Sequence, residues 1–166
     1  METTAPDLGF LCNKDKATIL RFQKTAPVNI VAVGEAFGLK VYEDELPNNI
    51  SGKIRKDNRF GGTACFSIIV NTHEPTVRKR FTIAHEISHY LLHREQIGDE
   101  LTDDALYRSG LSTLAEVRAN KLAAEILMPY SLIEEALNKG AKTINELASA
   151  LQVSKQAMRV RLEIPS

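Results

Sequence analysis

The chain has 166 residues, which fits one domain or one domain with a small appendage, and its 43% hydrophobic content is enough to build a core. Its 21 basic and 21 acidic residues balance, so the molecule has no overall field that would attract nucleic acid or a membrane surface. No run approaches the roughly 18 apolar residues of a membrane span, and we expect no secretion signal and no membrane contact. Cys12 and Cys65 lack metal-ligand spacing, which favours reduced thiols and a cytoplasmic location.

The sequence before residue 76 predicts packing elements rather than chemistry. Residues 13–24 indicate an amphipathic helix, and residues 28–38 indicate a second helix with Asn29 as its cap and Gly38 as its stop. Short strands are predicted at 39–43, 50–55 and 64–70, the last being the most apolar. Glycines at 52, 61 and 62 are interpreted as turn residues in preference to places where a ligand backbone approaches closely.

Residues 80–93 contain the pattern His85-Glu86-x-x-His89. On a helix, residues four apart share one face, so both imidazoles can reach a single metal ion, while Glu86 is placed to take a proton from water at that ion. The alternative is a pair of ordinary helix histidines. The flanking residues are apolar nearly all round, which predicts a buried helix whose polar side chains need partners. A metal ion would satisfy them together.

A catalytic zinc site usually has three protein ligands. His93 lies eight residues beyond His85, which is about 12 Å along a regular helix, so we assign it a supporting role instead of ligation. The better candidate is Glu116, which with Asn120 interrupts an otherwise small and apolar helix stripe in residues 114–129. Glu116 could instead simply favour the helix dipole. The opposite, polar face of that helix is predicted at Arg118, Lys121 and Glu125.

Residues 94–113 are polar and weakly patterned, and we expect a long loop between the two ligand-bearing helices, with Ser112 or Thr113 capping the second. Hydrolysis also needs a group that stabilises the oxyanion. Candidates without distinguishing spacing are Tyr107, His93, Tyr90, His73 and Tyr130.

The last part of the chain is predicted to be helical. Residues 131–140 indicate a helix capped by Ser131 and stopped by Gly140, and residues 143–162 are similar to a helix-turn-helix in which Ser154 caps the second helix. Gln152 stands where such motifs commonly have glycine. A modest basic face is expected from Lys155, Arg159 and Arg161. We therefore predict two parts, residues 1–130 and residues 131–166.

The two motifs together, His85-Glu86-x-x-His89 and Glu116-x-x-x-Asn120 leading to Met128-Pro129, resemble the ImmA/IrrE family of zinc-dependent metallopeptidases. The resemblance covers most of the chain. It implies an α+β, minimal zincin-like domain, a small β-sheet packed on helices with a helix-turn-helix-like C-terminal lobe. It also implies His85, His89 and Glu116 as zinc ligands, with Mn²⁺ as an alternative ion, and Glu86 as the catalytic base.

The resemblance further implies a zinc endopeptidase that cleaves a helix-turn-helix, XRE-like repressor and so derepresses a stress or mobile-element regulon. A second hypothesis is a non-proteolytic partner, or toxin component, paired with a helix-turn-helix antitoxin. A third, less favoured hypothesis is a DNA-binding regulator that uses residues 143–162. The protease requires Glu86, association does not, and DNA binding requires the basic face of the last helix and a steep salt dependence.

Overall fold

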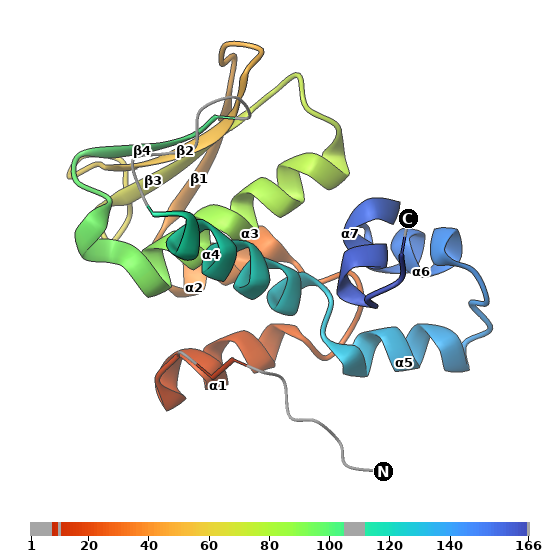
Figure 1. Ribbon diagram of the computed structural model, residues 1–166. Coiled ribbons are helices and arrows are strands. Elements are labelled where there is room, and N and C mark those ends of the chain that lie inside the picture. The colour runs from red at the N-terminus through yellow and green to blue at the C-terminus, as the bar shows by residue number, and fades with distance from the viewer. Residues whose placement is uncertain (1–7, 10, 105–111, 166) are drawn as a thin grey trace.

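The computed structural model describes residues 8, 9, 11–104 and 112–165. Within them the chain folds into a four-stranded mixed sheet of order β1-β3-β2-β4 that packs on helices, which confirms the expected α+β class (Figure 1). The strands are β1 (Lys40–Asp44), β2 (Ile50–Lys56), β3 (Phe66–Asn71) and β4 (Glu100–Asp104). The helices are α1 (Asn13–Phe22), α2 (Ile30–Ala36), α3 (Thr76–His93), α4 (Thr113–Leu127), α5 (Tyr130–Asn138), α6 (Ile144–Leu151) and α7 (Lys155–Arg161), with a 3₁₀ turn η1 (Arg94–Gln96).

Helix α3 is the structural centre of the molecule. In Figure 1 it runs between the sheet and α4. Helices α5, α6 and α7 form a separate group beyond the C-terminal end of α4. Ten of its residues are buried, from Thr82 to Tyr90 together with His93. None of the described helices is long and apolar enough to cross a membrane.

The sheet holds α3 in place through its central strands. All six residues of β3 are buried, and the strand lies inside the sheet, with β1 paired in parallel on one side and β2 in antiparallel on the other. A Cβ atom added to Gly52 of β2 would lie 2.5 Å from Cγ2 of Thr82 and 2.9 Å from the carbonyl oxygen of Ile69. Gly52 therefore lets α3 approach the sheet closely, a role that the turn interpretation missed.

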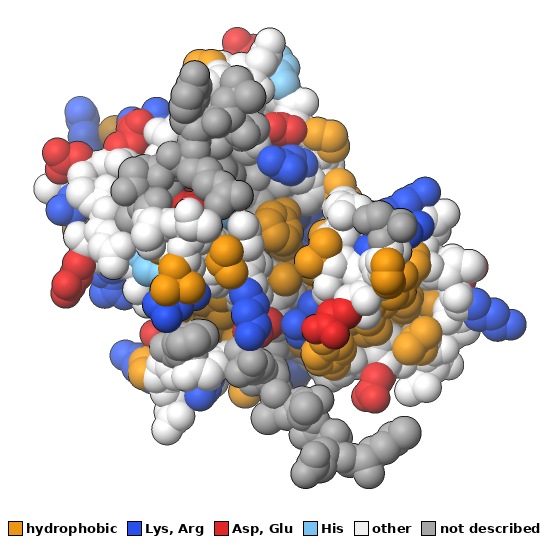
Figure 2. All heavy atoms as spheres, in the orientation of Figure 1, with side chains coloured by type: hydrophobic (Ala, Val, Ile, Leu, Met, Phe, Trp, Pro, Cys, Tyr) orange, Lys and Arg blue, Asp and Glu red, His pale blue; other side chains and the backbone are white. Residues whose placement is uncertain are grey.

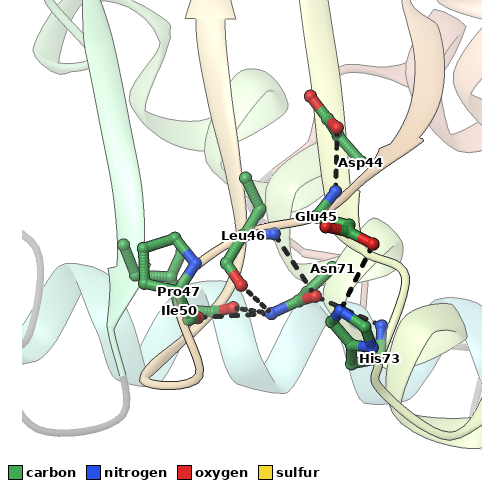
Figure 3. Close-up of polar contacts among 7 residues, drawn as sticks. All are labelled: Asp44, Glu45, Leu46, Pro47, Ile50, Asn71 and His73. Atoms are coloured by element: carbon green, nitrogen blue, oxygen red, sulfur yellow. Dashed lines mark hydrogen bonds and ion pairs between the residues drawn. The ribbon is translucent and has the colours of Figure 1, made fainter.

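Buried Asn71, at the end of β3, ties the loop after β1 to the entrance of α3 (Figure 3). Its Nδ2 donates to the carbonyl oxygens of Leu46 at 3.0 Å and Ile50 at 2.9 Å, and its Oδ1 accepts from the backbone N–H of His73 at 3.2 Å. One amide thus satisfies backbone groups from two loops that are far apart in sequence.

Besides Gly52, three sequence predictions need correction. The segment 94–113 is not only loop: it contains η1 and β4, an edge strand that pairs with β2 and buries Leu101. An edge strand with one buried apolar side chain carries too little pattern to be detected.

Ser131 does not cap α5, because Pro129 is the N-cap residue and the helix begins at Tyr130. Glu125 is buried instead of exposed, because α1 covers that face of α4 and Gln23 Nε2 donates to the carbonyl oxygens of Glu125 and Ile126.

Helices α6 and α7 form the expected helix-turn-helix-like pair. Thr143 and Glu146 make a capping box at the start of α6, and Ser154 Oγ accepts from the N–H of Ala157 at the start of α7. Gln152, in the turn, adopts the left-handed conformation with φ of 51°, the conformation for which glycine is usually selected.

Candidate metal centre

The two helices that the motifs predicted bring three polar side chains to one point. His85 and His89 lie one turn apart on α3, and Glu116 lies in the first turn of α4, where Ser112 caps the helix. The two Nε2 atoms are 2.9 Å apart. The carboxylate of Glu116 lies 3.3 Å from the Nε2 of each histidine. One ligand atom from each residue can be chosen so that all lie within 4.8 Å of one another.

The cluster is shielded from water. His85, His89 and Glu116 are 5%, 1% and 8% exposed. Burial, followed by the neighbouring His85, lowers the pKa of His89 from 6.5 to about 3. The His89 ring is therefore neutral at physiological pH, the form in which imidazole binds a metal.

Two further side chains fix the orientation of the imidazoles. Nδ1 of His85 lies 2.8 Å from Oδ1 of Asn120, and because an amide oxygen only accepts, this nitrogen carries the proton. When the His85 ring is neutral, its Nε2 is therefore unprotonated and faces Nε2 of His89 and the carboxylate of Glu116. Nδ1 of His89 lies 3.2 Å from Nδ1 of His93, which is also buried. When His89 donates in this contact, its Nε2 also presents a lone pair.

These contacts test whether the residues suit a metal ion. Two imidazoles and a carboxylate converge at one buried point, an arrangement of ligand atoms that a divalent cation between them would stabilise. Two nitrogen ligands and one carboxylate are a donor set that suits zinc and related divalent ions. The residues present therefore fit a divalent metal.

Glu86 follows His85 on α3 and is 1% exposed. Its position in the same turn as the first imidazole is the position from which a carboxylate can exchange a proton with water at the cluster.

The sequence also offered several candidates for stabilising an oxyanion. Tyr90 is buried and packs edge-to-face on Phe66 at 5.4 Å, so it belongs to the core. His73 lies 3.8 Å from the carboxylate of Glu45, near the entrance of α3. Tyr130 stacks with Arg161 at 4.1 Å. Tyr107 lies outside the described residues. Among the candidates that the structure describes, His93 is the one that contacts the cluster.

A buried His-Glu-x-x-His helix paired with a glutamate from a second helix, beside a small sheet, defines the class of zincin-like metallopeptidase domains. Residues 35–163 match the model of the Peptidase_M78 family, described as the IrrE N-terminal-like domain. The chain belongs to this family.

Two curated relatives are both described as radiation response metalloprotease IrrE, one from Deinococcus radiodurans and one from Deinococcus deserti. Each is 38% identical over an alignment of 94 residues, which covers 52% of this chain. The matches cover 27% and 32% of those proteins, so the chain spans about a third or less of their length. A solved structure of a Mycobacterium tuberculosis transcriptional regulator superposes with a TM-score of 0.57 over 93% of this chain and 48% of its own. At 19% identity that likeness supports the fold alone.

Proposed function

We propose that this chain is a zinc-dependent endopeptidase that cleaves a helix-turn-helix repressor. The observation that carries the proposal is the convergence of His85, His89 and Glu116 in one buried cluster, one residue along α3 from Glu86. Family membership supports peptide hydrolysis as the reaction. The names of the two relatives, both radiation response metalloproteases, support proteolysis in a stress response. A repressor substrate would place the reaction in the cytoplasm.

In this proposal each residue has a separate task. His85, His89 and Glu116 hold the ion, which supplies Lewis acidity to the scissile carbonyl and acidifies water at the site. Glu86 takes the proton from the attacking water and returns it to the leaving amine. Asn120 holds the proton on Nδ1 of His85, and His93 orients His89. We further propose that residues 1–130 perform this chemistry and that residues 131–166 form a lobe for recognition.

The decisive experiment compares the native protein with Glu86→Gln at matched zinc content. The test substrate is a purified helix-turn-helix repressor, taken from a neighbouring gene where there is one, and the readout is cleavage followed by mass spectrometry. We expect both proteins to bind zinc equally and Glu86→Gln to cut about 10²–10⁴ times more slowly. Glu134→Gln, which removes an exposed carboxylate from α5, is the matched control and should cut at the native rate.

The same experiment identifies the alternative. If neither protein cuts, but both release the repressor from its operator, the chain acts by association with its partner. If the native protein binds no zinc, the metal centre itself is wrong.

A further inference from the structure

A groove opens beside the metal centre, between α3, α4 and α7. Its volume is about 650 Å³, a size that accommodates several side chains of a bound ligand. Figure 2 shows hydrophobic side chains on both sides of the hollow between α4 and α7. Three large apolar residues of the groove lining are exposed: Val160 at 66%, Val117 at 54% and Tyr130 at 43%. Exposed apolar side chains that face one another across a groove indicate a surface for a partner.

The groove borders the metal centre at Asn120. Asn120 forms part of its wall and also contacts Nδ1 of His85. Phe81, one turn before His85 on α3, lines the same wall. A chain lying in the groove would therefore pass directly beside the residues that we propose for hydrolysis.

The α7 wall is fastened to the helices of the metal centre. Nε of Arg80 on α3 donates to the carbonyl oxygen of Gln152, in the turn before α7, at 3.1 Å. Nε of Arg161 on α7 donates to the carbonyl oxygen of Met128, at the end of α4, at 2.9 Å. Because α7 is held at both of its ends, this wall of the groove is preorganised, and the protein loses less conformational entropy when a ligand binds.

The charged residues of the groove favour an acidic occupant. The basic side chains in its lining are Arg78, Lys121 and Arg161, against the single acidic side chain of Glu163. Arg78 and Lys121 are both exposed, and each stands beside an apolar part of the wall. An apolar ligand that carries carboxylates would therefore be complementary to the groove.

The geometry argues against DNA as the occupant. Ala157 and Val160 of α7 line the groove beside Gln156 and Arg161, and Arg161 is already held by the carbonyl oxygen of Met128 and the ring of Tyr130. A helix that reads DNA presents several polar and basic side chains to the major groove. Lys155 and Arg159 do not line the groove, and α7 is only seven residues long.

We infer that the groove between α3, α4 and α7 is the docking site for an amphipathic segment of the protein substrate. Its apolar side chains pack between Val117 and Val160, and its carboxylates face Arg78 and Lys121. The inference rests on the proposed function, because it takes the occupant to be the substrate of the adjacent metal centre. It assigns to α7 the recognition of a protein segment in place of DNA.

The test measures binding separately from cleavage. A phage library of random 12-residue peptides is selected on full-length Glu86→Gln protein loaded with zinc. The enriched peptides are then synthesised and titrated by fluorescence anisotropy. We expect enriched sequences to carry two or more large apolar residues next to Asp or Glu. We expect Val160→Glu, introduced in the same protein, to weaken their binding by at least about tenfold, because it removes an apolar contact and adds a repelling charge.

Leu137→Glu provides the matched control, because Leu137 is an exposed apolar residue of the same lobe, at 47%, and does not line the groove. It should leave peptide binding unchanged, and both variants should retain the zinc content of the parent. The inference is overturned if no peptide is enriched, if the enriched peptides bind Val160→Glu as well as the parent, or if a DNA duplex occupies the groove and is displaced by the Val160→Glu change. Because Glu86→Gln is used throughout, these outcomes stand apart from the cleavage experiment, whose failure would overturn the proposed reaction without removing peptide binding.

Discussion

At the metal centre polar side chains are buried, whereas in the adjacent groove apolar side chains are exposed. His89 is 1% exposed although it is polar, and Val160 is 66% exposed although it is apolar. Polar side chains are usually exposed and valine is usually buried. In our proposals a different ligand accounts for each observation: a divalent ion in the first case and a segment of the protein substrate in the second. The comparison suggests where to separate the proposed chemistry from the proposed recognition, because the cluster and the groove share Asn120.

Asn120 is the residue at which this separation can be tested. Replacing it with alanine removes the acceptor for Nδ1 of His85 but leaves the apolar walls of the groove. We expect zinc affinity to fall by about 10–100-fold, as is usual when a partner of a metal-bound histidine is lost. Peptide affinity should change little. Zinc titration and peptide anisotropy on the same protein sample check both values.

Val117→Ala is the counterpart on the same helix, and should weaken peptide binding while leaving zinc affinity at the native value. If Asn120→Ala and Val117→Ala affect both ligands equally, the metal centre and the groove are not separable.

Replacing Gly52 tests how strongly the stability of the protein depends on the close packing of α3 against the sheet. An added Cβ would overlap Thr82 of α3 and the backbone of Ile69, so we expect Gly52→Ala to lower the free energy of unfolding by about 1–3 kcal/mol. Urea denaturation followed by circular dichroism measures the loss. Gly34→Ala is the matched control, because its added Cβ would come no closer than 3.4 Å to Ile87. It should be neutral or stabilising, since alanine favours α2. Equal stability of the two variants would mean that α3 does not depend on this close contact.

Replacing Glu146 tests how the capping box of α6 stabilises the helices that include α7. Hydrogen bonds from the backbone N–H groups of Lys142 and Thr143 lower the pKa of its carboxyl group below 4.5. A group whose pKa is lowered by folding stabilises the folded state above its unfolded value and loses this effect as the pH falls through the folded value. We therefore expect the native protein to be modestly more stable than Glu146→Gln at neutral pH, and the difference to shrink below pH 4.5. Thermal unfolding of the metal-free proteins measures this. A difference independent of pH would show that the charge of Glu146 is not responsible.

The sequence predicted the elements of the metal centre because their signals are local. A four-residue spacing places His85 and His89 on one helix face, and a carboxylate within a small, apolar stripe marks Glu116. The structure brings these three residues together as expected. The helix caps at Asn29, Ser112 and Ser154 are confirmed for the same reason, since a cap depends on the next three residues.

Features that depend on distant pairs were missed. Strand β4 exists because it pairs with β2, and its own residues carry little apolar pattern. The burial of Glu125 depends on α1, and the role of Gly52 depends on Thr82, so neither can be inferred from neighbouring residues. The groove was not predicted because its walls come from three helices that are separated in sequence.

The most direct test of the central claim is X-ray absorption spectroscopy at the zinc edge, with total metal content measured on the same samples. We predict one ion per chain, coordinated by two imidazole nitrogens and by carboxylate oxygen. Glu116→Ala should lose the carboxylate contribution, and His89→Ala should lose one imidazole or the ion itself. A native spectrum with no imidazole ligands, or a spectrum that both variants leave unchanged, would contradict the assignment of His85, His89 and Glu116 as the metal ligands.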